Sequence, residues 1–408
     1  MRRERLARLV ARARVARLLA ALNRDGEEAR VIGGAVRNTL LGRAVTDVDI
    51  TTTAPPERTT ALAEAAGFKA VPTGIEHGTV TVIVRGEPFE VTTLREDVET
   101  DGRHARVRFG RSFEADARRR DFTINALSLS ADGTLHDPVG GLADLAARRV
   151  RFIGDPARRI AEDYLRVLRF FRFHAEYGEG PLDPGGLAAA IRAQGALARL
   201  SRERVRAEIL KLVAARRAPA VVAEVATAGI VARVLGVVGE PGRLARAGRG
   251  DPVRALAAYA VLVEEDAERL AERLRLSNAE AARLGAFARA LAALRAPDPP
   301  LDEAAIRRVA ALHGPGALAD ALAALAGEPR PALTPEAEAA AARFASGDEP
   351  APALPLRGGD LTARGVPAGP RIGALMGEAR ALWLAGGCRT GAPERERLLR
   401  HIAPSSES

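Results

Sequence analysis

The sequence predicts an α+β fold, in which a sheet-containing N-terminal part precedes a long all-helical part. Two runs rich in β-branched residues, 79–84 and 89–94, flank a Gly-Glu-Pro turn at 86–88, which is the pattern of two strands joined by a turn. Beyond residue 215 the chain consists of alanine- and leucine-rich segments broken by proline and glycine. That composition is typical of helices joined by short connections.

A candidate phosphate-binding turn follows a short apolar strand that ends at residues 31–32. Gly33 and Gly34 let backbone N–H groups approach a phosphate closely. Arg37, one helical turn later, offers a planar guanidinium fork to the same oxygens. An ordinary strand–turn–helix has the same outline, so the interpretation depends on what comes next.

Asp47 and Asp49 come next. Side chains at positions i and i+2 of a strand point to the same side, so the two carboxylates are expected to converge while Val48 and Ile50 face a core. Convergent carboxylates hold divalent ions for displacement at phosphorus, and Mg²⁺ suits hard oxygen ligands. An isolated Asp-x-Asp also fits a solvated strand end, but the preceding Gly-Gly-x-x-Arg favours metal-dependent nucleotidyl transfer.

These residues resemble the first motif of a known family. Gly-Gly-Ala-Val-Arg (33–37), Leu-Leu-Gly (40–42) and Thr-Asp-Val-Asp (46–49) are similar to that motif in class II tRNA nucleotidyltransferases and poly(A) polymerases, which belong to the DNA polymerase β superfamily. Further stretches match in order across residues 30–215. The resemblance implies a nucleotidyltransferase head (1–150) with a mixed sheet, a helical neck that recognises the base (151–215), a helical body (216–346) and a tRNA-binding tail (347–408).

A third acidic residue lies in the second predicted strand. Glu90 has apolar neighbours, among which a charge without a partner is costly. The resemblance implies that Glu90 completes the metal site or acts on the attacking hydroxyl. The polar segment 95–111 fits a solvated loop, and the resemblance implies the flexible loop that helps to switch from adding C to adding A.

The second matching motif, 118–126, gathers arginines beside an aspartate and a buried Phe-x-Ile pair. This combination suits a helix start that faces a polyanion, although a surface cluster of ion pairs has the same composition. The resemblance implies that Arg120 contacts the triphosphate, and that Asp121 and Asn125 shape the sugar and nucleotide pocket. The third motif, 137–154, is expected to have a structural role between head and neck.

The fourth motif, 162–173, is predicted to be a helix with one polar face. Asp163, Arg166, Arg169 and Arg172 recur every three residues, and the apolar residues between them can pack inward. A helix with i,i+3 ion pairs has the same spacing. The resemblance implies that Asp163 and Arg166 read the base edge of C or A in place of a template, while Arg169 and Arg172 lean towards phosphate or help to place the base.

Two further segments are matched by the resemblance. The helix predicted at 200–211 pairs Arg204 with Glu208 at i,i+4, and the resemblance implies that it buttresses the base-reading helix. Glycines between 359 and 373 resemble a tail motif of bacterial members. They can expose backbone N–H groups to RNA phosphate, although a helix–helix turn fits equally well.

Composition agrees with an RNA-directed enzyme of several domains. The chain has 408 residues and a formal net charge of +9, carried almost wholly by arginine, which suits phosphate binding. Its single cysteine, Cys388, excludes an internal disulfide framework and favours a reducing cytoplasm. No apolar run is long enough to span a membrane. The arginine-rich segment 1–21 is superficially like a transit peptide, but Glu4 and the lack of serine favour a helix beside the head.

The resemblance implies a two-metal enzyme that adds C, C and A to the 3′ end of tRNA from CTP and ATP with Mg²⁺ and releases pyrophosphate. No membrane and no obligate protein partner are expected. A poly(A) polymerase is the closest alternative, but residues 77–82 read His-Gly-Thr-Val-Thr-Val where that enzyme has a Gly-Arg-Arg-Phe type of run. An A-adding tRNA nucleotidyltransferase stays open. The intact Asp47 and Asp49 disfavour a non-catalytic RNA-binding scaffold.

Overall fold

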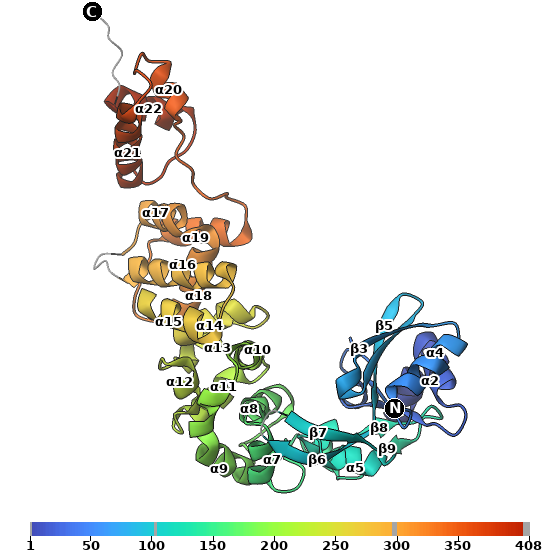
Figure 1. The fold of residues 1–408 in the computed structure, drawn as a ribbon. Helices are drawn as coiled ribbons and strands as arrows, with labels where there is room; N and C mark the ends of the chain where they lie inside the picture. Colours follow the sequence, from blue (N-terminus) through green and yellow to red (C-terminus); the bar gives the residue numbers. More distant parts are fainter. Residues whose placement is uncertain (1, 102–103, 296–299, 403–408) are drawn as a thin grey trace, which may run out of the picture. The chain divides into compact units, whose positions relative to one another are not determined.

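The computed structural model describes residues 2–101, 104–295 and 300–402, and for residues 96–101 and 104–107 it describes the backbone alone. The chain divides into two compact units, Met1–Glu208 and Ile209–Ser408 (Figure 1). The helices that begin in the first unit are α1 (Arg2–Val10), α2 (Ala13–Leu22), α3 (Gly34–Leu41), α4 (Pro56–Ala65), α5 (Phe113–Arg118), α6 (Gly141–Ala146), α7 (Pro156–Glu162), α8 (Leu165–Tyr177), α9 (Pro184–Ala193) and α10 (Arg202–Val213), with 3₁₀ turns η1 (Ile75–His77), η2 (Thr123–Asn125) and η3 (Gln194–Arg199).

The strands that the described residues form all belong to the first unit. They are β1 (Ala29–Ile32), β2 (Ile50–Thr52), β3 (Lys69–Gly74), β4 (Thr79–Val84), β5 (Glu87–Thr93), β6 (Arg95–Asp101), β7 (His104–Phe109), β8 (Ser128–Leu129) and β9 (Leu135–His136). Seven of them form one sheet with the order β3-β4-β5-β2-β1-β8-β9, while β6 and β7 pair separately. The larger sheet is mixed, because β2 runs parallel to β5 and antiparallel to β1.

The register of this sheet brings acidic residues to one end of its strands. Ile50 of β2 pairs with Val91 of β5, so the preceding residues, Asp49 and Glu90, lie side by side. The Ile32 N–H donates to the Asp49 carbonyl oxygen at 3.0 Å, which brings the end of β1 to the same place. We call this end of the sheet, formed by Ile32, Asp49 and Glu90, the carboxylate end.

Two N-terminal helices cover part of the sheet. α2 and α4 lie together against it, and α1 packs on α2 and α3 (Figure 1). The leucines and valines of α1 and α2 are buried, whereas their arginines are exposed. Each fully buried side chain of this kind contributes about 1.5–3 kcal/mol. The helix expected over residues 1–21 is therefore two helices packed beside the head.

The segment predicted as a loop at 95–111 instead contains the paired strands β6 and β7, which form a β-hairpin. Residues 102 and 103, which belong to the same prediction, lie outside the described residues. A polar composition does not exclude such a hairpin, because its strands satisfy each other's backbone groups. The base of the hairpin contacts η1. Arg95 Nη1 donates to the His77 carbonyl at 3.1 Å, and the Phe109 ring lies where a Cβ on Gly78 would come within 2.7 Å.

An aromatic core joins the segment after the hairpin to α8. Phe122 and Phe152 form a backbone bridge with ring centroids 4.9 Å apart. Phe152 contacts Phe170 of α8 at 5.3 Å, and Phe122 contacts Phe173 at 5.2 Å. These rings are buried, so α8 is fixed beside residues 121–125 by apolar packing and presents its polar face to the site described below.

The second unit consists of helices. They are α11 (Ala218–Ala226), α12 (Ile230–Leu235), α13 (Pro241–Ala247), α14 (Pro252–Ala260), α15 (Glu264–Leu274), α16 (Asn278–Arg295), α17 (Glu303–His313), α18 (Pro315–Leu325), α19 (Pro335–Ser346), α20 (Gly358–Thr362), α21 (Pro370–Ala385) and α22 (Ala392–Ile402). α16 packs against α14, α15, α17 and α18 through buried residues such as Leu284, Phe287 and Leu291. Leu361, Ala379 and other apolar residues of α20–α22 form a separate small core.

The predicted fold class is confirmed. A mixed sheet with helices forms the N-terminal part, and every regular element after β9 that the described residues form is a helix. Within the part of the chain that the structure describes, no helix combines the length and apolar character needed to cross a membrane.

Candidate active site

The glycine turn after β1 has the geometry that only glycine adopts readily. Gly33 has φ +59° and ψ −116°, and its N–H donates to the Leu127 carbonyl at 3.0 Å. α3 starts at Gly34, and the Arg37 N–H donates to the Gly33 carbonyl at 3.0 Å. The turn therefore presents the N-terminus of a helix, where backbone N–H groups are available to an anion.

Arg37 is held in a buried position by an aromatic residue far along the chain. Its side chain is 6% exposed, its Nη2 donates to the Tyr177 hydroxyl at 2.8 Å, and its guanidinium lies 3.9 Å from the centre of that ring. Nη1 donates to Asn125 Oδ1. Burial lowers the pKa of Arg37, but arginine titrates so high that the group remains a cation at neutral pH. A fixed positive charge thus lies one turn into α3.

Asp47 and Asp49 precede β2 rather than lying within it, so the predicted strand begins too early. The alternation holds nonetheless, because both aspartates are exposed while Val48 and Ile50 are buried. The backbone bond from Ile32 to Asp49 extends the ladder and keeps this alternation in register. The prediction that Glu90 is buried among apolar residues is also wrong. Its side chain is exposed, on the face of the strand opposite Phe89 and Val91.

The pKa of Asp49 reflects the negative charges of the other carboxylates nearby. Partial burial raises the pKa of Asp49, the negative charges of Glu90 and Asp47 raise it further, and Arg120 counteracts them. A carboxylate that is repelled by two others gains from a bound cation. The carboxylate end is thus a concentration of negative charge with a guanidinium beside it.

A buried aspartate orients two arginines of the second motif. Asp116 is 3% exposed; its Oδ1 accepts from Arg119 Nε and Nη2 at 2.9 and 2.6 Å, and its Oδ2 accepts from Arg120 Nε and Nη2 at 3.2 and 2.8 Å. Burial by itself raises the pKa of Asp116, but the charges of Arg120 and Arg119 outweigh it and the pKa is lowered. One carboxylate thus fixes two guanidiniums.

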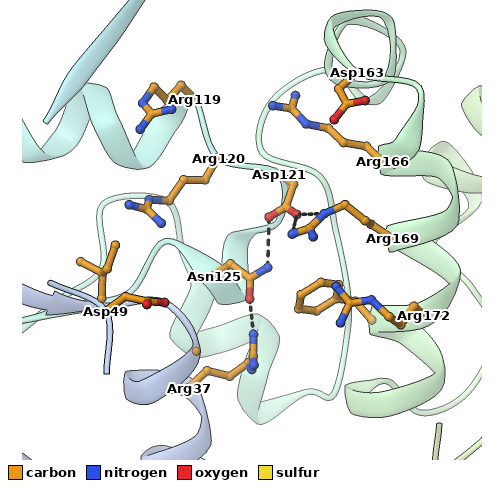
Figure 2. Close-up of a pocket in the computed structure, with 14 residues that line it drawn as sticks. Arg37, Asp49, Arg119, Arg120, Asp121, Asn125, Asp163, Arg166, Arg169 and Arg172 are labelled. Atoms are coloured by element: carbon orange, nitrogen blue, oxygen red, sulfur yellow. Dashed lines mark hydrogen bonds and ion pairs between the residues drawn. The ribbon is translucent and has the colours of Figure 1, made fainter. Parts of the chain in front are cut away.

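A continuous chain of hydrogen bonds crosses the site (Figure 2). Asn125, which accepts from Arg37, donates through Nδ2 to Asp121 Oδ1 at 3.0 Å. Asp121 Oδ2 accepts from Arg169 Nε and Nη2 at 2.9 and 2.5 Å, and its Oδ1 also accepts from the Phe122 N–H at 2.8 Å. α3, η2 and α8 are thereby tied together by polar contacts as well as by the aromatic core.

The fourth motif, 162–173, is not one helix, because α7 ends at Glu162 and α8 begins at Leu165. Asp163 lies between them with extended backbone (φ −155°), and its Oδ1 accepts from the Leu165 N–H at 3.1 Å. Such a local bond competes with helix formation. Asp163 Oδ2 also accepts from Arg204 Nη2 at 2.6 Å. The predicted pairing of Arg204 with Glu208 is therefore wrong.

Arg166, Arg169 and Arg172 do share one face of α8, and each has a carboxylate partner. Arg166 Nη1 donates to Glu162 Oε2 at 2.6 Å and to the Arg159 carbonyl at 2.9 Å. Arg172 Nε donates to Glu208 Oε2 at 2.5 Å, and the Arg172 guanidinium lies 4.2 Å from the centre of the Phe173 ring. Carboxylates therefore hold these three arginines in fixed orientations.

These side chains line one cavity of about 460 Å³ in the first unit. Figure 2 shows Asp49 and Arg120 on one side of it and Asp163 and Arg166 on the other. The cavity collects every predicted nucleotide-binding residue together with Asp49, whereas Asp47 and Glu90 lie outside its lining; the lining residues are Ile32, Gly33, Gly34, Arg37, Asp49, Arg119, Arg120, Asp121, Asn125, Asp163, Arg166, Arg169, Arg172 and Phe173. Arginines outnumber acidic residues there, which suits a polyanionic ligand.

Sequence reasoning missed the residues that orient the site. Arg119 was visible as part of an arginine triplet, and Asp116 lies three and four residues before the arginines it holds, so helical spacing offered a signal for both. Tyr177 and Glu208 are separated by long stretches of chain from Arg37 and Arg172, and nothing in the sequence connects them. Only the packing of α8 reveals those contacts.

Comparison with protein families and curated proteins agrees with the resemblance seen in the sequence. The model of the poly A polymerase head domain matches residues 29–151. The mitochondrial CCA tRNA nucleotidyltransferase 1 of Homo sapiens is 44% identical over 193 residues, which are 47% of this chain and 44% of that protein. The CCA-adding enzyme of Geobacillus stearothermophilus is 38% identical over 225 residues, 55% of this chain and 54% of that protein. These matches span about half the length of the curated relatives.

Solved structures extend the similarity over the whole chain. The crystal structure of the Bacillus stearothermophilus CCA-adding enzyme in complex with CTP superposes with a TM-score of 0.72 at 30% identity, covering 94% of this chain and 95% of that one. The Thermotoga maritima CCA-adding enzyme complexed with tRNA gives a TM-score of 0.68 over 98% of both chains, and at 18% identity it supports the fold alone.

Proposed function

The chain belongs to the family of CCA-adding enzymes, and we propose that it adds C, C and A to the 3′ end of tRNA from CTP and ATP, with release of pyrophosphate. One observation carries this proposal. A single cavity combines an aspartate of the Asp-x-Asp pair, arginines suited to a triphosphate, and an aspartate–arginine pair suited to a base edge. Nucleotidyl transfer needs metal binding, triphosphate binding and base recognition within the length of one nucleotide.

The residues at the carboxylate end, together with Asp47, fit Mg²⁺. Asp47, Asp49 and Glu90 offer hard oxygen ligands, and burial and the negative charge of Glu90 raise the pKa of Asp49, as expected where acidic side chains crowd together. Within the described residues no three acidic, histidine or cysteine side chains are grouped tightly enough to form a closed metal site. Mg²⁺ is usually bound by one or two carboxylates together with water and substrate phosphates.

The same chemistry assigns roles to the residues on each side of the cavity. Bound Mg²⁺ would stabilise charge on the attacking and leaving oxygens. The N–H groups at the start of α3 and the guanidiniums of Arg119 and Arg120 bind the triphosphate, and Asp116 keeps those guanidiniums in place. Catalysis then consists mainly of positioning the α-phosphate against the RNA hydroxyl in an electrostatically prepared site.

We propose that Asp163 and Arg166 select the base. A carboxylate accepts from the amino group of cytosine or adenine and a guanidinium donates to their ring acceptors, whereas uracil and guanine present the opposite pattern at those positions. Asp163 is pre-positioned by Arg204, and Arg166 by Glu162, so the pair is oriented before a nucleotide arrives. Asp121, Asn125, Arg169 and Arg172 form the wall that places the sugar and base beside this pair.

The test is primer extension by the purified full chain with Mg²⁺ on tRNAs that end before CCA, after C and after CC. Each is offered CTP, ATP, both, UTP or GTP. Addition of C, C and one A, followed by a stop, supports the proposal. Repeated A on any RNA end indicates a poly(A) polymerase, and A on the CC end alone indicates an A-adding enzyme. Binding of tRNA without any incorporation would leave the scaffold alternative.

Two matched variants sharpen this test. Asp49→Asn is expected to abolish incorporation with every substrate, because the charge at the carboxylate end is lost. A double Asp163→Ala, Arg166→Ala variant is expected to retain metal-dependent incorporation but to accept UTP and GTP. If that double variant still chose only C and A, the base-reading role would be refuted. The cytoplasmic location expected from the single cysteine stays a prediction, for which fractionation of cells expressing the chain is the measurement.

A further inference from the structure

A second cavity, of about 360 Å³, lies in the first unit outside the candidate active site. Its walls come from the connection between α1 and α2 and from the turn between β4 and β5. We call it the α1–α2 groove, and its lining residues are Arg12, Ala13, Arg14, Val15, Val48, Arg85, Glu87 and Phe89.

The floor of the α1–α2 groove is apolar and reaches the carboxylate end. Val15, Val48 and Phe89 form it and are 2%, 7% and 2% exposed. Val48 is the residue between the two aspartates, and Phe89 precedes Glu90. Because side chains alternate along extended chain, this floor lies on the other face of the sheet from Asp49 and Glu90. The groove and the carboxylates therefore meet at the same end of the same strands.

The walls of the α1–α2 groove carry guanidiniums without carboxylate partners. In the part of the chain that the structure describes, the side chains of Arg12 and Arg85 make no hydrogen bond and no ion pair, whereas Arg14 Nη1 contacts Glu87 Oε2 at 2.8 Å. Arg85 is also held with φ +50°, in the left-handed region. By contrast, five of the six arginines that line the candidate active site have a carboxylate partner, namely Arg119, Arg120, Arg166, Arg169 and Arg172. Three arginines against one glutamate leave the groove with positive charge for an anion.

The positive charge continues along α1 and α2, which favours a polymer over a small anion. Residues 2–17 contain seven arginines and one acidic residue, Glu4, and all seven arginines are exposed. A triphosphate or pyrophosphate would be satisfied by the groove alone. A nucleic-acid backbone uses a longer row of guanidiniums, because it carries a charge at every nucleotide and releases counterions at each contact.

We propose that the α1–α2 groove binds the RNA strand whose 3′ end reaches the carboxylate end. Arg12 and Arg85 contact its phosphates where the strand crosses the groove above the floor of Val15, Val48 and Phe89. The strand then passes over the end of the sheet to the side on which Asp49 and Glu90 lie. This inference rests on the nucleotidyl transfer proposed above, since that reaction requires an RNA hydroxyl at the carboxylates.

The experiment compares full-length Arg12→Gln, Arg85→Gln and the double variant with Arg24→Gln. Arg24 is an exposed arginine beyond the end of α2, roughly 15–18 Å from Arg12 along the helix axis, and it does not line the groove. The equilibrium dissociation constant for tRNA that lacks its 3′ CCA is measured over a range of salt concentrations without nucleotide. Steady-state KM values for tRNA and for CTP, and kcat, are measured separately.

Each groove variant is expected to reduce the slope of log affinity against log salt by about 0.7, and the double variant by about 1.4, as for single-strand phosphate contacts. The KM for tRNA should rise about tenfold in the double variant, with kcat and the KM for CTP unchanged. Arg24→Gln should match the parent chain, and Arg85→Lys, which keeps the charge, should retain the slope.

An unchanged salt slope and tRNA affinity in the double variant would overturn the proposal. So would a raised KM for CTP with normal tRNA binding, because that result assigns the groove to a triphosphate. The binding measurement does not depend on catalysis. If the parent chain adds no nucleotide yet the groove variants weaken tRNA binding as expected, nucleotidyl transfer fails while the groove assignment stands as an RNA contact.

Discussion

Asp121→Asn tests how the site is held together, because one carboxylate there accepts hydrogen bonds from three residues in two segments. Asp121 accepts from Arg169, from Asn125 and from the Phe122 N–H. Asparagine has the same shape and its oxygen can keep the bonds from Asn125 and Phe122. Its amide nitrogen, however, is a donor placed against the Arg169 guanidinium, so both bonds to Arg169 are lost and a cation is left without its counter-charge.

The expected loss of stability is about 3 kcal/mol. Removing one partner of a buried ion pair costs roughly 3–5 kcal/mol. The lower end applies here, because the side chain of Asp121 is 9% exposed but that of Arg169 is 30% exposed and therefore partly solvated. Glu208 Oε1, 3.7 Å from Arg169 Nη1, also compensates in part. A loss of this size is a large fraction of the roughly 5–15 kcal/mol that stabilises a typical domain.

The effect has a defined pH dependence. Burial alone raises the pKa of Asp121, but the Arg169 charge and the hydrogen bonds from Asn125, Arg169 and Phe122 outweigh it and the pKa is lowered. A carboxyl whose pKa is lower in the folded than in the unfolded state stabilises the fold above its unfolded pKa. That contribution is lost as the pH falls through the folded pKa. The free energy of unfolding of the parent chain should therefore exceed that of the variant most at neutral pH, and the difference should disappear in acid.

The assay is urea unfolding followed by far-ultraviolet circular dichroism, together with hydrogen exchange of the α8 amides. Trp383 is the single tryptophan and lies in the second unit, so its fluorescence separates that unit's transition from the first. The control is Glu114→Gln, whose partner Arg118 is in an exposed i,i+4 pair worth at most about 1 kcal/mol. If Asp121→Asn were as stable as this control, or its deficit were the same at every pH, the reasoning would be refuted.

Three other perturbations follow from the same contacts. Asp49→Asn should raise the melting temperature at neutral pH without divalent ions, because an acid whose pKa is raised by burial and by neighbouring carboxylates destabilises the fold above that pKa. The gain in melting temperature should fade in acid. An unchanged melting temperature at neutral pH would contradict this. Asp116→Asn should raise the KM for CTP about tenfold by releasing two guanidiniums, with the KM for tRNA unchanged; equal increases in both would argue for general misfolding. Gly141→Ala should lower the free energy of unfolding by about 2 kcal/mol in a thermal unfolding experiment, because its Cβ would come 2.1 Å from the Thr123 carbonyl oxygen. The control Gly195→Ala, where the added Cβ meets open space, should change the free energy of unfolding by no more than about 0.5 kcal/mol. Similar values for the two variants would be inconsistent with the packing.

Local patterns in the sequence predicted a structural feature correctly wherever that feature is caused by neighbouring residues. The turn at Gly33 depends on a φ that glycine adopts, and the strands β4 and β5 follow from β-branched residues around a turn, so both were predicted. The apolar side of α8 is visible from helical spacing, and Leu168 and Phe171 are buried as expected. Local patterns also indicated the α+β class, whereas most of the residues that line the cavity were implied by the resemblance to tRNA nucleotidyltransferases.

Local patterns failed where a nearby residue competes with the regular repeat. Helical spacing runs through Asp163, yet its side chain bonds to the Leu165 N–H and ends the helix there. Charged residues at 95–111 indicated a loop, although hairpin pairing needs no apolar face. The exposure of Glu90 was misjudged because its apolar neighbours, Phe89 and Val91, face the opposite side of the strand.

The partners of the site arginines were decided by tertiary structure alone. The sequence placed Arg204 opposite Glu208 because they are four residues apart, but Arg204 instead contacts Asp163 and Glu208 contacts Arg172. A long guanidinium can reach several carboxylates at equal local cost, so the choice depends on which helix faces pack together. The sequence by itself therefore indicated which charged residues belong to the site of this protein. The packing of the aromatic core against α8 decided which carboxylate contacts each arginine.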